Sequence, residues 1–501
     1  MTATRGAGTP KGSPAGTGIE PAEATDPGVR RSARAVLLLS IAEVVGKVVT
    51  LALLLYAVRV LTPAEFGSFS YALSFGMLLA VLPAWGLDAL LVQQVGADRS
   101  RLPGQYAQLL LLRTMLAVPV VVLGAAAGAL TRPTAEDRFA LVAMLVAAVL
   151  ESYAHAPRNV AGVLRRQSTV ALVLVGQRLL TAGAAIGALA AGWGLVGLSS
   201  AYVAITLLGT AALFLVVARA GGRPSWTGIT KRTLGRTARL SVPLGIDALV
   251  AMFLFRAHTL MLGWFHGDTA VAEYTPPYRL VETVLFVTWA VSRVTYPAMA
   301  SAADLASLRR ALSSGLSVTA FVFAPFAALM IVRGPDVLAL LFGDYYADTG
   351  ATVLRVLALT PLAFAVGYLF SYAFVAQGRN GVALVTSLIA AVANLVANLL
   401  LLPPLSTLGA ALTTTGSYLL EALLLVAVAR RSFGALGMVS ALALPMLSSV
   451  PAAAVALIPL PVLPALVLAG ACYLAVWLLA ARRWQPANLA VLMSVVPGRR
   501  K

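Results

Sequence analysis

The feature that most constrains this chain is a succession of long apolar runs separated by short charged breaks. A helix of about 20 apolar residues is long enough to cross a bilayer, and lipid favours helices because they satisfy their own backbone hydrogen bonds. Hydrophobic residues make up 60% of the 501 and charged residues only 11%, which excludes a soluble enzyme, a coiled coil and a disordered chain. The sequence therefore predicts an all-α polytopic membrane protein of about fourteen spans. These cover residues 35–58, 67–92, 105–130, 139–157, 168–189, 195–218, 240–264, 276–299, 312–332, 352–376, 381–402, 408–429, 437–459 and 464–481.

The distribution of basic residues predicts the orientation of these spans. With the N-terminus in the cytoplasm and loops assigned alternately, 26 of the 37 Lys and Arg fall in cytoplasmic segments and 6 in external ones. This asymmetry follows the positive-inside rule. It also explains the net charge of +18 without a nucleic-acid partner. Fourteen spans with both termini cytoplasmic is the resulting prediction.

The domain plan follows from loop lengths and a weak internal repeat. Gly194 to Arg219 resembles the stretch from Ser406 to Arg430, about 211 residues later, and duplicated halves are common in transporters. We predict two six-helix lobes and two additional C-terminal helices, flanked by tails that are too polar to bury a core. The predicted segments are a disordered tail 1–33, lobes 34–218 and 240–430 with a cytoplasmic linker 219–239 between them, extra spans 431–482 and a basic tail 483–501.

Motifs for enzyme chemistry are absent from the sequence. There is no HExxH zinc motif and no phosphate-cradling GxxxxGK[ST] loop. Cys472 stands alone and the three histidines are scattered, so no metal site or cofactor is predicted. No external loop exceeds about 20 residues, which argues against a membrane glycan polymerase or ligase. We expect a transporter rather than an enzyme.

Ionisable residues inside the spans are the candidates for function, because burying a charge in lipid is costly. Glu43 and Lys47 lie four residues apart in the first span, on one helix face, and are expected to form an ion pair. Either the two charges only neutralise each other, or Lys47 holds an anionic substrate. Arg256 lies in span seven with no acid within one helical turn, and we expect it to line a cavity, with snorkelling to the interface as the alternative. His258, two residues on, is expected to be structural.

Span eight and three further polar positions complete the candidate set. Arg279 and Glu282 are three apart and are expected to pair, and Arg293 follows 14 residues after Arg279 on the same face. Three other residues are weaker candidates for substrate contact. They are Arg178, which could instead pair with Glu151 or Glu421, and Asn394 and Asn398, which are expected to hydrogen-bond between helices.

A cavity with more Lys and Arg than acids suits an anionic group, especially phosphate or pyrophosphate. A carrier of organic cations would be expected to display acids instead. The sign of the charge therefore favours an anionic substrate.

Seven short motifs follow one another along the chain. They are Arg59-Val-Leu-Thr-Pro-Ala-Glu-Phe-Gly67, Gly86-Leu-Asp88, Phe255-Arg256-Ala-His258, Val271-Ala-Glu-Tyr274, Leu341-Phe-Gly343-Asp-Tyr345, Ala376-Gln-Gly378-Arg379 and Leu408-Gly-Ala-Ala411. Their order and spacing are more specific than any one of them. Together they resemble the bacterial polysaccharide flippases, the O-antigen-type lipid-linked oligosaccharide transporters of the multidrug/oligosaccharidyl-lipid/polysaccharide (MOP) exporter superfamily, and the match runs over about residues 35–430.

The resemblance implies two six-helix lobes in a V around a cavity lined by spans one, two, seven and eight, with alternating access. It favours Lys47, Arg256, Arg279 and Arg293 over Arg178 as cavity residues. Where the family often carries an acid two positions after the span-seven Arg, this chain has His258.

The function implied by the resemblance is translocation of an undecaprenyl-phosphate- or pyrophosphate-linked glycan across the bacterial cytoplasmic membrane. The expected partners are that lipid-linked glycan and membrane lipids, with a glycan polymerase and assembly proteins as further partners that the sequence leaves open. Coupling to a proton or sodium gradient is also left open. The alternatives are a multidrug or organic-cation exporter of the same superfamily and a lipid-linked peptidoglycan-precursor flippase.

Overall fold

All regular elements are helices in the residues that the computed structural model describes, 45–164, 166–434 and 438–484. A helix through residues 45–60 comes first. The later helices are α2 (Pro63–Leu79), α3 (Val81–Ala84), α4 (Leu87–Ala97), the short 3-10 helix η2 (Arg99–Arg101), α5 (Leu102–Thr131), α6 (Ala135–Val163), α7 (Gln167–Ala190), α8 (Gly194–Arg219), α9 (Lys231–Ala300), α10 (Leu305–Phe342), α11 (Asp344–Leu357), α12 (Thr360–Ala376), α13 (Asn380–Phe433), α14 (Met438–Ala456) and α15 (Val462–Trp484).

Eleven helical stretches in the described part of the chain are long and apolar enough to cross a membrane. Two of them are too long for one crossing, because 70 residues of α9 would extend about 105 Å at 1.5 Å per residue. Each contains one residue with non-helical dihedral angles, Gly267 (φ 78°) in α9 and Ser406 (φ 47°) in α13, where the chain direction changes. The all-α polytopic class is confirmed, whereas the number fourteen stays a prediction.

Several predicted boundaries differ from the observed ones. The stretch 67–92 is divided into α2, α3 and α4. The break between α3 and α4 arises because Trp85 and Gly86 have left-handed dihedral angles. The predicted linker 219–239 is only partly a loop. Thr230 caps α9 by accepting a hydrogen bond from the Thr233 amide, so the helix already begins at Lys231.

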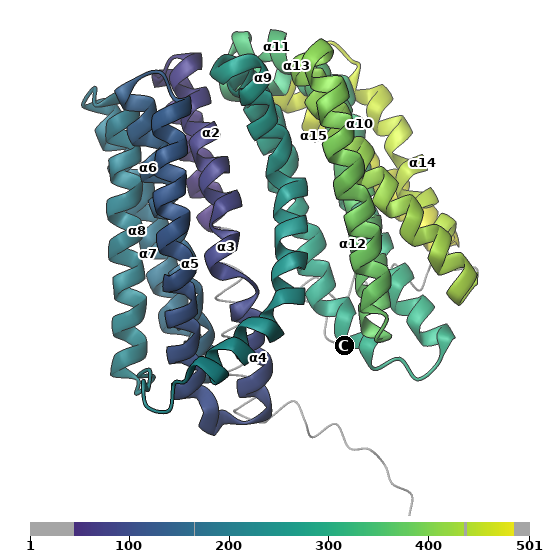
Figure 1. The fold of residues 1–501 in the computed structure, drawn as a ribbon. Helices are drawn as coiled ribbons and strands as arrows, with labels where there is room; N and C mark the ends of the chain where they lie inside the picture. Colours follow the sequence, from purple (N-terminus) through teal and green to yellow (C-terminus); the bar gives the residue numbers. More distant parts are fainter. Residues whose placement is uncertain (1–44, 165, 435–437, 485–501) are drawn as a thin grey trace, which may run out of the picture.

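The helices form two bundles in Figure 1, one containing α2 to α8 and the other α9 to α15, with α9 on the side that faces α2. The helix through residues 45–60 lies with the first bundle, since a Cβ atom on Gly46 would be 3.3 Å from the Arg178 side chain in α7. In the first bundle α6 packs on α8 and on α2, and in the second α10 packs on α14. The turns alternate between two faces. We call the face with residues 98–101, 220–230, 301–304 and 377–379 the arginine-rich face, and that with residues 132–134, 267, 343 and 406 the opposite face.

The bundles close on each other at the opposite face. A Cβ atom on Gly67 of α2 would lie only 1.8 Å from the backbone oxygen of Asp268 in α9, so only glycine permits this approach. Arg132, between α5 and α6, forms an ion pair with the same residue, at 2.7 Å from Nη1 to the Asp268 carboxylate. The Arg132 guanidinium also lies 3.6 Å from the centre of the Tyr71 ring.

A second closure lies nearer the arginine-rich face. A Cβ atom on Gly86 would lie 2.5 Å from the Leu244 Cβ, and one on Gly245 would lie 2.7 Å from the Trp85 ring. The break between α3 and α4 therefore packs directly on α9. Arg256 is 11 residues after Gly245 and 12 before Asp268, which places it about 17 Å along α9 from either closure.

Candidate functional site

The centre of the candidate site is a carboxylate shared by two arginines. Arg256 Nη2 lies 2.6 Å from Glu282 Oε1, and Arg279 Nη1 lies 2.7 Å from Glu282 Oε2. Arg256 is 4% exposed, and the side chains of Arg279 and Glu282 are 19% and 15% exposed. Each carboxylate oxygen thus binds a different guanidinium in a largely dehydrated setting, where charge-assisted hydrogen bonds are strong.

The turn at Gly267 explains why these residues meet. Arg256 precedes the turn by 11 residues and Glu282 follows it by 15, so the two halves of α9 bring them to a similar depth. Arg279 and Glu282 are three apart and share a helix face, which confirms their predicted pairing. The partner of Arg256 was missed, because it lies 26 residues away and spacing within one helical turn cannot reveal it.

Lys47 extends the basic site to the first helix of the other bundle. Its Nζ lies 5.8 Å from the centre of the Trp289 ring in the second half of α9, a cation–π contact. The predicted partner Glu43 lies outside the described residues. Within the described part of the chain, Lys47, Arg256 and Arg279 place three cations around the carboxylate of Glu282.

Arg293 lines a separate cavity of about 480 Å³ between α9 and α12. It lies four residues after Trp289, one turn further towards the arginine-rich face. The lining residues are Trp289, Ser292, Arg293, Tyr296, Pro297, Tyr368 and Tyr372.

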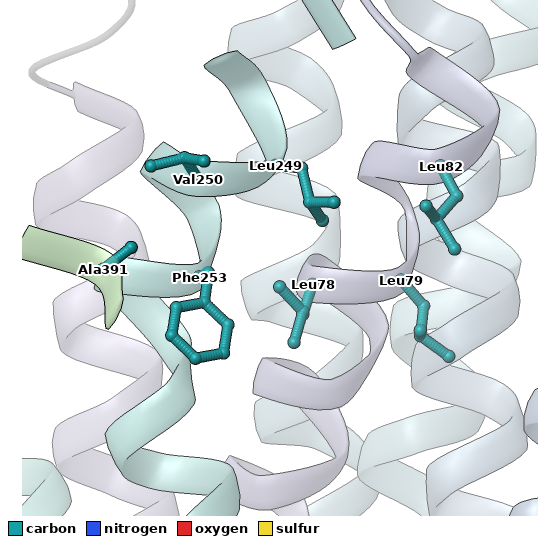
Figure 2. A pocket seen from close by; sticks show the side chains of 7 residues that line it. All are labelled: Leu78, Leu79, Leu82, Leu249, Val250, Phe253 and Ala391. Atoms are coloured by element: carbon teal, nitrogen blue, oxygen red, sulfur yellow. The ribbon is translucent and has the colours of Figure 1, made fainter. Parts of the chain in front are cut away.

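An apolar cavity of about 320 Å³ lies between the bundles, bordered by α2, α3, α9 and α13 (Figure 2). Leucines from α2 and α3 face side chains of α9 across it, and Phe253 lies three residues before Arg256. It has a wholly apolar lining, so it suits hydrocarbon rather than a charged group. Its residues are Leu78, Leu79, Leu82, Leu249, Val250, Phe253 and Ala391.

The weaker candidates lie in structural contacts elsewhere. Arg178 Nη2 is 3.5 Å from Glu151 Oε1, which also accepts a 2.7 Å hydrogen bond from Arg158. Of the two pairings predicted for Arg178, the structure forms the one with Glu151.

The two asparagines connect the two halves of α13, as expected. Asn394 donates to the Ser417 hydroxyl at 2.9 Å, and Asn398 accepts from the Thr413 hydroxyl at 2.8 Å. Both asparagines are fully buried. This network satisfies polar groups between helices.

His258 is fully buried in the second bundle. The centre of its ring lies 5.1 Å from that of Tyr274 and 4.7 Å from that of Tyr278. This position, inside an aromatic cluster, agrees with the structural role that the sequence suggested.

A further ion pair with a buried arginine was also not predicted from the sequence. Arg113 of α5 is 0% exposed and lies 2.7 Å from Asp88 of α4, while its Nε donates to the Pro83 carbonyl at 3.4 Å. The pair therefore joins both sides of the break at Trp85 and Gly86. A signal was present, since Arg113 lies within an apolar span and Asp88 belongs to the motif Gly86-Leu-Asp88, but 25 residues separate them.

The fold is that of the membrane transporters of the MOP superfamily. A solved structure of the lipid II flippase MurJ in an inward closed conformation aligns with a TM-score of 0.74 at 12% identity, covering 89% of this chain and 99% of that one. An inward-facing multidrug resistance MATE family transporter of the MOP superfamily aligns with a TM-score of 0.64 at 16% identity, covering 81% and 99%.

The chain belongs to the polysaccharide biosynthesis protein family, whose model matches residues 32–303. The model of the lipid II flippase MurJ matches residues 267–479. A probable flippase, AglR of Haloferax volcanii, is 27% identical over 205 residues, which cover 39% of this chain and 42% of that protein. The chain thus matches less than half the length of this curated relative. The resemblance to the polysaccharide flippases of the MOP superfamily is confirmed.

Proposed function

We propose that this protein is a flippase that moves an undecaprenyl-phosphate- or pyrophosphate-linked glycan across the cytoplasmic membrane of a bacterium. The observation that carries the proposal is the carboxylate of Glu282 held between Arg256 and Arg279. A phosphate presents the same kind of oxygens to arginine as a carboxylate does, and arginine binds both in bidentate geometry.

The site also fits the chemistry of translocation. A phosphate that entered would compete with Glu282 for Arg256 and Arg279, with Lys47 as a third cation on the other bundle. The polar group would bind here while the polyprenyl chain stays in apolar surroundings. No covalent step is needed, so we propose a transporter rather than an enzyme.

Alternating access would work through the two closures. The contact of Gly67 with Asp268 would open towards one side of the membrane, and the contact of Trp85 with Gly245 towards the other. Rocking of the bundles around a fixed site is a common transport plan. By the positive-inside rule, the arginine-rich face would lie on the cytoplasmic side of the membrane. An ion gradient or the membrane potential would supply the energy for transport.

A second candidate function is translocation of a lipid-linked peptidoglycan precursor. It is favoured by the match of residues 267–479 to the lipid II flippase model, because these residues include Arg279 and Glu282. The headgroup chemistry is the same in both cases, so the glycan distinguishes them. Export of organic cations is disfavoured, since Glu282 is already held by two arginines.

The test is thermal stabilisation of the purified full chain by undecaprenyl pyrophosphate and, separately, by the organic cation ethidium. We expect the lipid to raise Tm in the wild type, to do so far less in Arg256→Gln, and to act normally in Arg310→Gln. Arg310 is a matched control because it is exposed on α10, away from the site. Stabilisation by ethidium alone would contradict the proposal and favour a cation exporter.

A further inference from the structure

One face of the second half of α9 carries a continuous row of polar and aromatic side chains. Arg279, Glu282, Trp289, Arg293 and Tyr296 follow one another at spacings of three, seven, four and three residues. These spacings keep side chains on one side of an α-helix. The row runs from the shared carboxylate into the cavity that Arg293 lines, and Trp289 contributes to both regions.

The cavity has the size of a small-ligand site. Its volume of about 480 Å³ lies within the usual range of about 300–1,000 Å³ for such sites. Four of its seven lining residues are aromatic, and the polar ones are Ser292 and Arg293. Ligand sites of this kind combine apolar or aromatic walls with a few polar groups that fix orientation.

The tyrosines of the cavity hold one another in place. The rings of Tyr368 and Tyr372 are stacked at 4.7 Å between centroids, and the Tyr368 hydroxyl donates to the Tyr372 hydroxyl at 3.0 Å. Tyr296 meets Tyr372 edge to face, at 5.3 Å and 86°. The rings and hydroxyls that border the cavity are therefore preorganised by contacts with each other.

Trp289 is fixed on its other side by an aromatic cluster. Its ring lies 6.2 Å from that of Phe255 and 6.3 Å from that of Phe364. Phe255 is the residue directly before Arg256. The position of Trp289 is thus coupled through packing to the helix segment that carries the anion-binding arginine.

We propose that this cavity is a glycan-binding subsite for the sugar that lies next to the phosphate of the lipid carrier. A pyranose ring has C–H faces and a rim of hydroxyl groups. The C–H faces suit the negative faces of Trp289, Tyr296 and Tyr372, while the tyrosine hydroxyls and Arg293 provide hydrogen bonds to the rim. This inference rests on the proposed function. It identifies the first sugar as the part of the substrate that adds affinity to that of the phosphate.

The distance between the shared carboxylate of Glu282 and the cavity allows one substrate molecule to bind in both places. Trp289 follows Glu282 by seven residues, which is about 10 Å along the helix. A diphosphate bound by Arg256 and Arg279 would therefore place its first sugar at the Trp289 end of the cavity. Aromatic faces recognise C–H surfaces rather than one hydroxyl pattern, so the subsite would accept related sugars.

The test compares two probes on the purified full chain, undecaprenyl pyrophosphate and the same lipid bearing one N-acetylhexosamine. We expect the sugar to tighten Kd by about three- to tenfold, the size of one or two aromatic contacts. Tyr296→Ala and Tyr372→Ala should abolish this difference and leave Kd for the bare lipid unchanged. Trp264→Ala is the matched control, because Trp264 is an exposed aromatic residue of α9 outside the cavity.

The outcomes separate this inference from the proposed function. Equal Kd values for the two probes in the wild type, or equal weakening of both by the tyrosine variants, would overturn the subsite while leaving the anion site intact. Binding of neither probe by folded wild-type protein would overturn both. Weakening of both probes in Arg256→Gln, with the sugar contribution retained, is the result expected of independent phosphate and sugar regions.

Discussion

Arg256 and Glu282 join the two halves of α9 by a contact of 2.6 Å between Nη2 and Oε1, with Arg256 almost fully buried. The second oxygen of the same carboxylate binds Arg279. The resting site is therefore already occupied by an anion that belongs to the protein. This relationship sets the expected response of the site to mutation.

Glu282→Gln should lower the stability of the protein in the absence of lipid and increase its stabilisation by anionic lipid. The amide cannot neutralise the two arginines, and an unpaired buried charge costs about 3–5 kcal/mol. The same change removes the competitor for phosphate. We expect a lower Tm without lipid and a larger rise in Tm with undecaprenyl phosphate, measured by thermal unfolding in detergent. A smaller rise than in the wild type would contradict competition.

Gly67→Ala should open the closure at the opposite face. The added Cβ would lie 1.8 Å from a backbone oxygen of α9, so the two bundles must separate there. The distance between spin labels at Arg138→Cys and Asp348→Cys, in a Cys472→Ser background, should increase.

Gly183→Ala is the matched control for this change. Gly183 lies within α7, and no neighbouring atom lies within 4 Å of the position that an added Cβ would take. The substitution should leave the label distance unchanged and raise helix stability by about 0.5–1 kcal/mol. An unchanged distance in Gly67→Ala as well would mean that this contact does not hold the bundles together.

Arg132 and Asp268 should be energetically coupled across the same closure. Their side chains are 9% and 17% exposed, so the pair is better shielded than a surface salt bridge. We expect a coupling free energy of about 0.5–3 kcal/mol in a double-mutant cycle of Arg132→Gln and Asp268→Asn, followed by thermal unfolding. Simple additivity of the two substitutions would show that the pair does not stabilise this closed form.

Arg113→Met should destabilise the fold through the break between α3 and α4. The substitution removes the partner of Asp88 and the donor to the Pro83 carbonyl. Removing one member of a buried ion pair costs about 3–5 kcal/mol. Arg138→Gln, at an exposed arginine near the start of α6, should have almost no effect on Tm. Equal Tm values for the two variants would contradict the role assigned to Arg113.

The class of fold could be predicted from the sequence because lipid imposes a simple rule. Long apolar runs must become helices, and the helices lie close to the predicted windows. The breaks inside those windows were missed, because a left-handed residue such as Trp85 depends on tertiary contacts and leaves hydropathy unchanged. The helical start of α9 at Lys231 was also missed, since a basic segment has no apolar signal.

The candidate site could be predicted only as a set of residue types. Arg256, Arg279 and Glu282 could be chosen as candidates because a charged side chain inside a membrane span is energetically costly. The fold brings these three residues into one region. Sequence spacing revealed the pair of Arg279 with Glu282, three residues apart, but not that of Arg256 with Glu282, which depends on the turn at Gly267. Contacts between helices are set by tertiary packing, and one sequence does not encode them locally.

The most direct test of the central claim is translocation of a fluorescent undecaprenyl pyrophosphate-linked sugar in proteoliposomes. A membrane-impermeant quencher reports the fraction of probe in the outer leaflet over time. We predict rapid exchange of the probe between leaflets with the wild type and with Arg310→Gln. With Arg256→Gln we expect exchange to be at least about tenfold slower, because the variant loses about one charge-assisted hydrogen bond to the phosphate. Exchange by Arg256→Gln at the wild-type rate would contradict a basic site that carries the phosphate.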